Sequence, residues 1–176
     1  MAHHKLHPNH TWRAKEGHRI VVLDRGAVRF DIPEQWVVIP SEKLLTIYDK
    51  QPPADDCRLE VSIFKTPLVN WNGLPLSALL MSVLNSEQRT PDQEVHKRKL
   101  GDKELAWTEL AFVDRQEHRA ARSRICLARG SGVHSLLTLD FWASDVEPVS
   151  RVWDEILESL QLERYVEDPT RGPQVH

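Results

Sequence analysis

The sequence predicts an α+β fold in which two helices pack on an antiparallel β-sheet of about six or seven strands. Several segments alternate apolar and polar residues with the period of two that is typical of strands. Two other segments repeat apolar residues at the helical spacing of three and four. The links between successive strands are short, and short links join antiparallel neighbours because parallel neighbours need a long crossover.

The predicted strands extend over most of the chain. Val28, Phe30 and Ile32, for example, alternate with polar residues and give a strand with one apolar face. The strand segments are residues 20–23, 28–32, 36–39, 44–48, 58–65, 94–100, 104–113, 120–128 and 134–142. Residues 136–142 are apolar on both faces, as a strand needs when its sheet is covered on both sides. We therefore expect this strand at the centre of the sheet.

The two predicted helices have different start signals. The first follows Pro75, carries apolar residues at positions 76, 79, 80, 83 and 84, and is expected to end before Thr90. In the second, Ser144 and Glu147 fit a capping box and Pro148 fits the first turn. Its apolar positions are 149, 152, 153, 156 and 160.

Length and composition fit one globular domain. The chain has 176 residues, of which 40% are hydrophobic and 28% charged, with a net charge of -3. This charge argues against nucleic acid as a partner. No apolar run is long enough for a membrane span, and residues 1–12 lack the apolar core of a signal peptide. We therefore expect no membrane insertion and a cytoplasmic location.

We expect three parts along the chain. Residues 1–18 are polar and His-rich and are predicted to form a flexible segment. Residues 19–162 form the single domain, and residues 163–176 form a flexible tail.

Two segments resemble the PsbP-like and DcrB-like proteins. Residues 26–36 read GAVRFDIPEQW and resemble the opening of these proteins, where a strand runs into Ile-Pro and then Trp. Residues 153–162 read WDEILESLQL and resemble their terminal helix. The order of elements between these segments also matches, so the resemblance covers roughly residues 20–162. It implies a three-layer α/β/α sandwich around an antiparallel sheet.

The resemblance implies binding rather than catalysis. The group includes an extrinsic photosystem II subunit, a nuclear import factor that binds a Ran GTPase, DcrB-type envelope lipoproteins and EagR-type cytosolic chaperones of type VI secretion effectors. This sequence shows no export signal and no lipobox cysteine, so the cytosolic chaperone or adaptor branch is the nearest. The resemblance implies an uncharacterised bacterial member and supplies no catalytic residues.

Known catalytic motifs are not found in the sequence. It contains no GxSxG, HExxH or Walker motif, and the glycines at 130 and 132 fit a hairpin turn. Cys57 and Cys126 lie in or beside predicted strands and are interpreted as buried structural residues. Asp55, Asp56 and Glu60 would form an acid/base set, but a solvated loop is the favoured interpretation.

Four histidines near the N-terminus raise a metal hypothesis. They are His3, His4, His7 and His10. A free amine at Ala2 would complete a square-planar nitrogen set with two amides and the His4 imidazole, which suits Cu(II) or Ni(II). These ligands have no rigid scaffold, so adventitious binding is favoured over a physiological site. We expect no cofactor.

Six residues are candidates for a partner-binding surface: Tyr48, Leu68, Trp71, Trp142, Arg122 and Arg124. The aromatic and apolar members lie at strand ends or outside predicted elements, where they would form an exposed patch. The two arginines share one face of a strand and would meet phosphate or an acidic partner. The alternative is that their charge protects an edge strand from pairing with another chain. Trp36, Trp107 and Trp153 are instead expected in the core.

The leading interpretation is a non-enzymatic protein-binding module, a cytosolic chaperone or adaptor. We expect another protein as its partner and a monomer or homodimer as its state. The alternatives are an enzyme whose site residues are scattered along the chain, or weak metal binding through the N-terminal histidines. A deep polar pocket with converging titratable groups would favour the enzyme, and a shallow apolar groove would favour the binder.

Overall fold

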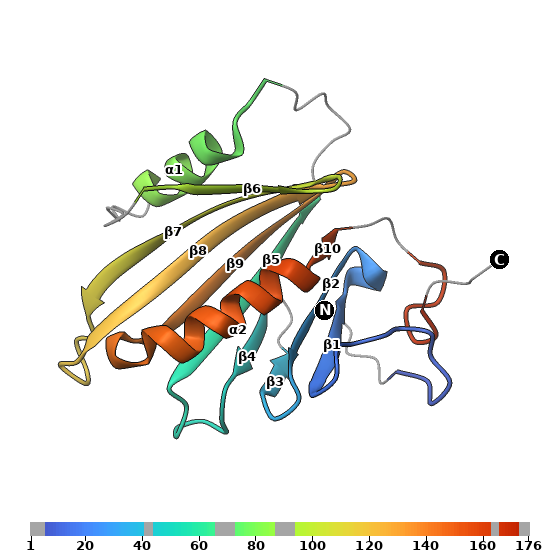
Figure 1. Cartoon of the computed structure of the whole chain (residues 1–176), viewed down its shortest axis with the longest axis horizontal. Coiled ribbons are helices and arrows are strands. Elements are labelled where there is room, and N and C mark those ends of the chain that lie inside the picture. The colour runs from blue at the N-terminus through green and yellow to red at the C-terminus, as the bar shows by residue number, and fades with distance from the viewer. Residues whose placement is uncertain (1–5, 41–43, 66–72, 87–93, 163–165, 173–176) are drawn as a thin grey trace.

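The computed structural model describes residues 6–40, 44–65, 73–86, 94–162 and 166–172. These residues form a seven-stranded sheet, a three-stranded sheet and two α-helices (Figure 1). The strands are β1 (His18–Leu23), β2 (Val28–Pro33), β3 (Val37–Pro40), β4 (Leu45–Tyr48), β5 (Cys57–Lys65), β6 (His96–Leu100), β7 (Lys103–Val113), β8 (Ala120–Gly130), β9 (Val133–Trp142) and β10 (Gln161–Leu162). The α-helices are α1 (Leu76–Ser86) and α2 (Val146–Ser159), and the 3-10 turns are Asp24–Gly26 and Ala143–Asp145.

The larger sheet is antiparallel throughout and has the order β3-β4-β5-β9-β8-β7-β6. β9 is therefore the central strand, as the sequence predicts. Its Leu137 and Leu139 are fully buried on one face. Consecutive hairpins build both halves of the sheet, and the pairing of β5 with β9 joins these halves.

The smaller sheet has the order β1-β2-β10. β10 pairs with β2 through Leu162 opposite Val28. This strand corrects the expectation that residues 153–162 are all helical. The helix ends at Ser159, and Leu160 has φ -58° and ψ 127°, which are not helical angles.

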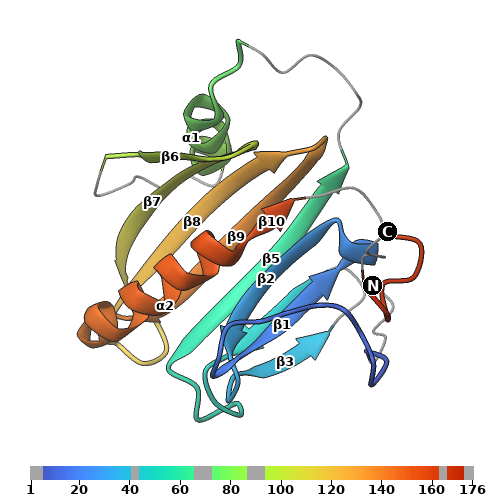
Figure 2. The ribbon, with the colours of Figure 1, turned by 45° about the vertical axis from the view of Figure 1, so that its right-hand side comes forward.

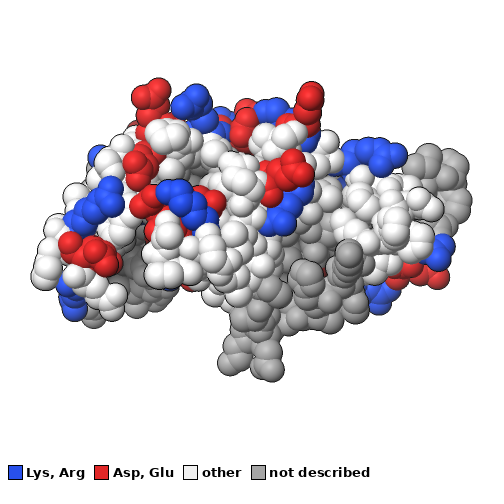
Figure 3. All heavy atoms as spheres, turned by 90° about the horizontal axis from the view of Figure 1, so that it is seen from below, with Lys and Arg blue, Asp and Glu red and all other residues white. Residues whose placement is uncertain are grey.

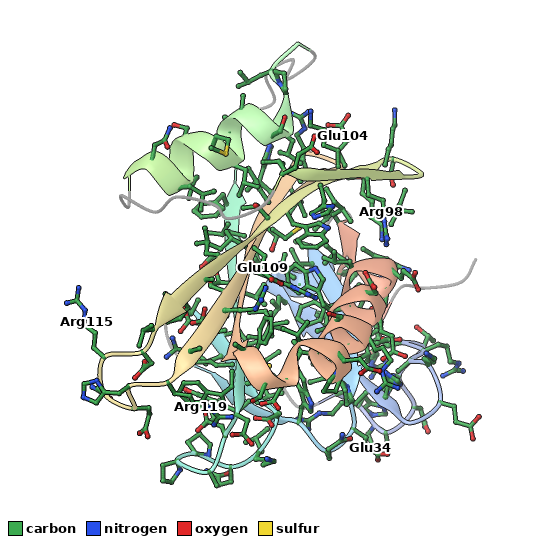
Figure 4. All side chains as sticks on the ribbon, turned by 60° about the vertical axis from the view of Figure 1, so that its left-hand side comes forward. Glu34, Arg98, Glu104, Glu109, Arg115 and Arg119 are labelled. Carbon is green, nitrogen blue, oxygen red and sulfur yellow. The ribbon has the colours of Figure 1, made fainter. Side chains whose placement is uncertain are left out.

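The two helices cover opposite faces of the larger sheet (Figures 2 and 4). α2 packs on β9 and on β2, so it also covers the smaller sheet. Trp153, Ile156 and Leu157 of this helix are fully buried in the main core. α1 buries Leu80 and Leu84 in a second cluster on the other face. The predicted three-layer α+β fold is confirmed, and neither described helix is long and apolar enough to cross a membrane.

The start of α2 differs from the predicted capping box. Ser144 lies in the preceding 3-10 turn, and the N-cap position is Asp145, which makes no side-chain capping bond. The Ser144 hydroxyl accepts a hydrogen bond from Arg119 at 2.7 Å. The predicted capping box is therefore wrong, whereas Pro148 lies in the first turn as expected.

The two terminal segments contact each other. The backbone N–H of Thr11 donates to the carbonyl of Arg171 at 2.7 Å, and the Trp12 indole donates to the carbonyl of Pro169 at 2.9 Å. Trp12 is only 3% exposed. Gly26 has a φ of +85°, and a Cβ at this position would lie 3.2 Å from the Trp12 ring. The flexibility expected for residues 1–18 and 163–176 stays a prediction, but their described parts make these specific contacts.

Arg122 and Arg124 of β8 point toward α2 and meet Glu109 of β7. Arg124 Nε lies 2.7 Å from Glu109 Oε2, and Arg122 pairs with the other carboxylate oxygen. Figure 4 shows Glu109 in the space between the sheet and α2. Arg124 also donates to Ser150 of α2 at 2.8 Å, which ties the sheet to the helix.

This cluster corrects the edge-strand interpretation of the two arginines. β8 lies between β9 and β7, so it is an interior strand that needs no protection from another chain. Glu109 is 3% exposed and Arg124 is 7% exposed. Burial alone would raise the pKa of Glu109, but hydrogen bonds and charge from Arg124 and Arg122 outweigh it and lower this pKa.

We predict that Trp12→Ala destabilises the fold by about 3 kcal/mol, because it removes a buried aromatic ring and leaves a cavity. The free energy of unfolding in urea measures the effect. Val113→Ala is the control, since Val113 is 63% exposed and should change stability by less than about 0.5 kcal/mol. An equal free energy of unfolding for Trp12→Ala and the wild type would show that the contacts of Trp12 do not stabilise the fold.

We predict that Glu109→Gln lowers the free energy of unfolding at pH 7 by about 3 kcal/mol, because two cations then lose their buried counter-charge. The folded-state pKa of Glu109 lies below its ordinary value of 4.5, so its stabilisation is present above that pH and is lost as the pH falls. Urea unfolding from pH 7 to pH 3 should therefore show a shallower decline for the variant.

The matched control is Glu104→Gln on the same strand. Glu104 also pairs with an arginine, Arg129, at 2.5 Å, but its side chain is 42% exposed. Exposed pairs contribute at most about 1 kcal/mol. If Glu104→Gln lowers the free energy of unfolding as much as Glu109→Gln does, Glu109 is not the buried charge on which Arg122 and Arg124 depend.

Candidate functional site

The face of the larger sheet that α1 covers only in part carries a groove of about 590 Å³. α1 packs on Ala106 and Leu127, and the groove lies toward the other end of these strands, where β5 begins and β7 ends. Four aromatic residues line the groove: the buried Phe141, and Tyr48, Phe112 and Trp142, after which we call it the aromatic groove. The structure thus brings together Tyr48 and Trp142, two of the six residues that the sequence singles out.

A row of polar side chains crosses the floor of the aromatic groove. The Ser123 hydroxyl donates to Asp140 Oδ1 at 2.6 Å, and Arg58 Nη2 donates to Asp140 Oδ2 at 2.9 Å. These residues lie directly opposite one another on β8, β9 and β5. Both oxygens of the Asp140 carboxylate therefore accept a hydrogen bond from within the protein, so this carboxylate is not left unpaired.

The aromatic rim is partly open to solvent. Phe112 is 42% exposed at the end of β7. Trp142 ends β9, and the Arg119 guanidinium lies 4.6 Å from the centre of its ring. Exposed aromatic side chains of this kind are frequent in surfaces that bind other proteins.

The loop between β4 and β5 supplies carboxylates to the groove. Asp49 Oδ1 accepts the backbone N–H groups of Asp56 and Cys57, each at 2.9 Å, which shapes the loop. Lys50 Nζ lies 2.5 Å from Asp56 Oδ2, and this hydrogen bond lowers the pKa of Asp56. Asp55 is partly buried beside it and also lines the groove.

Another carboxylate reaches the groove from the opposite wall. Asp114 follows β7, and backbone N–H groups of Glu117 and Gln116 lower its pKa. The lowered pKa values keep Asp56 and Asp114 ionised at neutral pH. From below, acidic and basic side chains lie side by side across this end of the molecule (Figure 3).

Both cysteines are buried, as the sequence predicts. Burial raises the pKa of the Cys57 and Cys126 thiols, so both are protonated at neutral pH and are weak nucleophiles. A general acid or base would need a pKa near the working pH, whereas the groove carboxylates Asp56 and Asp114 are shifted away from it. These pKa shifts do not prepare Asp56 or Asp114 for proton transfer at neutral pH.

The other predicted site residues lie elsewhere. Arg122 and Arg124 face α2, on the side of the sheet opposite to the aromatic groove, and Leu68 and Trp71 lie outside the described residues. Sequence reasoning missed Phe112, Asp114 and Asp140 as members of a site. Alternation along β7 and β9 shows on which face of its own strand Phe112 or Asp140 lies. Only the register of strand pairing shows that both side chains reach the same groove.

His7 and His10 form a turn near the start of the described chain. The backbone N–H of His10 donates to the carbonyl of His7 at 3.0 Å, and His7 Nδ1 accepts from the backbone of Asn9. His3 and His4 lie outside the described residues. Within the described ranges, no three His, Cys, Asp or Glu side chains are grouped so that they could hold a metal ion. Metal binding by the histidines stays a prediction.

Two solved structures share the fold. CyanoP, the PsbP protein of the cyanobacterium Synechocystis sp. PCC 6803, has a TM-score of 0.61 and 12% identity, over 85% of this chain and 94% of that one. The Ran-binding protein Mog1p of Saccharomyces cerevisiae has a TM-score of 0.53 and 11% identity, over 82% of this chain and 95% of that one. At these identities the likeness shows the fold alone, and it confirms the fold that the PsbP-like resemblance implies.

Sequence comparison identifies the family. The family model Alr1449 matches residues 19–166. The uncharacterised protein alr1449 of Nostoc sp. (strain PCC 7120) is 44% identical over 170 residues, which cover 95% of this chain and 88% of that protein. The chain therefore belongs to the Alr1449 family.

Proposed function

We propose that this protein is a non-enzymatic, protein-binding chaperone or adaptor of the cytoplasm, and that the aromatic groove receives its partner. The observation that carries the proposal is the convergence of Tyr48, Phe112 and Trp142 on an open groove beside charged side chains. Tyrosine and tryptophan are enriched among the residues that dominate binding energy at protein interfaces.

The polar floor supports the same role. Asp140 is already bonded to Ser123 and Arg58, so a partner can cover this row without leaving a buried charge unpaired. The partner gains its affinity from the aromatic rim, where apolar surface is still exposed to water.

The enzyme alternative has less support. The pKa values of Asp56 and Asp114 move away from neutrality, and the pKa of the Cys57 thiol is raised. None of these shifts prepares a nucleophile or a proton carrier for work at neutral pH. The yeast neighbour is by its name a Ran-binding protein, which supports protein binding as a role that this fold performs elsewhere.

We predict that a photo-crosslinking amino acid at position 112 captures one partner polypeptide in the cells that make this protein. Phe112 lines the aromatic groove, whereas the next residue, Val113, points to the opposite face and is 63% exposed. Position 113 is therefore the matched control. The crosslinked polypeptide is identified by mass spectrometry, and cell fractionation shows whether it forms in the cytoplasm.

Purified partner then tests the groove directly. Phe112→Glu should weaken binding by about tenfold or more, since it places a charge in the apolar contact, and Val113→Glu should leave binding unchanged. Circular dichroism checks that both variants are folded. Equal crosslinking at the two positions, or equal binding by the two variants, would exclude the groove as the partner site.

A further inference from the structure

We infer that the groove binds an extended segment of the partner that carries two cationic side chains four residues apart, with an apolar residue between them. This inference rests on the proposed function and adds the chemistry of the bound segment. Three features of the aromatic groove lead to it: its charge, two carboxylates that have no Lys or Arg partner among the described residues, and the distance between its walls.

Negative charge predominates around the groove among the described residues. The carboxylates that line or adjoin it are Asp49, Asp55, Asp56, Asp114, Asp140 and Asp145, and the cations are Lys50, Arg58 and Arg119. Such a surface attracts and orients a positively charged partner.

Most of these carboxylates already have partners within the protein. Asp140 is bonded to Arg58, and Asp56 is bonded to Lys50. Asp55 and Asp114 line the groove, and in the described part of the chain neither carboxylate forms a salt bridge with a Lys or Arg side chain. Asp114 accepts the backbone N–H groups of Gln116 and Glu117 through Oδ1, and the charge of His118 acts on it. Two carboxylates are therefore available to a cationic partner, and each is positioned by its own loop.

The two carboxylates come from opposite walls of the groove. Asp55 precedes β5, and Asp114 follows β7, with β9 and β8 between these strands. Three strand spacings of about 4.8 Å place the walls roughly 14 Å apart at the level of the sheet. A partner segment must span this distance to reach both carboxylates.

An extended segment spans the groove with a simple repeat. At about 3.3 Å per residue, four residues cover roughly 13 Å, and side chains four residues apart point to the same side. In a helix the same spacing covers only about 6 Å, so a helix with this repeat reaches one wall. The side chain midway between the cations then faces the sheet between β9 and β8, near Trp142 and Ala121.

The rim of the groove already holds one lysine ammonium and one arginine guanidinium of the protein itself. Lys50 places an ammonium against Asp56, and Arg119 places a guanidinium on the Trp142 ring. Arg115, on the same hairpin as Arg119, points outward from the hairpin tip and leaves the groove clear (Figure 4). The groove thus combines carboxylates and aromatic rings, the two groups that bind arginine side chains best.

Three fluorescent nonapeptides test the inference on the full chain by anisotropy at low salt. GSRSLSRSG carries arginines four residues apart, GSSRLRSSG has the same composition with arginines two residues apart, and GSESLSESG replaces arginine by glutamate. We expect the first peptide to bind at least about fivefold more tightly than the second, because the second reaches only one wall. The glutamate peptide should not bind.

Paired variants locate the effect. Asp55→Asn with Asp114→Asn should remove the preference for the four-residue spacing and weaken GSRSLSRSG by about fivefold or more. Asparagine keeps the side-chain oxygen that accepts backbone N–H groups after Asp114. The control, Asp154→Asn with Glu158→Gln, removes the same charge from α2 on the opposite face and should change nothing.

Three results would overturn the inference. Equal affinity for the two arginine peptides, or an equal loss in the α2 control, would reduce it to general charge attraction. If N-acetyl-arginine amide, at a concentration near the Kd of the peptide, displaces GSRSLSRSG from the protein, the groove would instead be a site for a small cation. The crosslinking experiment decides the proposed function separately, because a partner captured at position 112 supports that function whichever peptide binds best.

Discussion

The packing of α2 holds the fold together. The two sheets share no strand, and this helix covers an apolar face of both, with Trp153 and Ile156 fully buried between them. The ends of the helix are fixed by charge. Arg124 bonds to Ser150 in its first half, and Lys103 Nζ donates to the carbonyls of its last turn, where the helix dipole favours a cation. The position of α2 therefore sets the relative position of the sheets.

The same strands perform two tasks because their side chains alternate between faces. On β8, Arg122 and Arg124 point toward α2 and neutralise Glu109, while Ala121 and Ser123 line the aromatic groove. The buried charge cluster and the groove are thus opposite sides of one ladder. The hydrogen-bonded sheet between them forms the floor of the groove, so the partner proposed above would bind with little loss of conformational freedom.

The features that depend on local periodicity are predictable from the sequence. The strands of the larger sheet, its central strand and its two covering helices follow from alternation and helical spacing, and so does the burial of Cys57 and Cys126. The features that depend on strand register are not. No local pattern assigns Glu109 to the arginines of the next strand, or brings Asp55 and Asp114 to one groove from positions 59 residues apart. β10 was missed because a strand of two residues has no period of its own.

The strand order has a consequence for synthesis on the ribosome. β9 is the last strand of the larger sheet to be made, yet it occupies the centre. Until β9 emerges, the larger sheet consists of two incomplete meanders, β3-β4-β5 and β6-β7-β8. In these meanders, β5 and β8 each present an unpaired edge in the growing chain. The nascent protein must keep both edges from wrong pairing until residue 142 has been added, so cooperative folding is expected only late in translation.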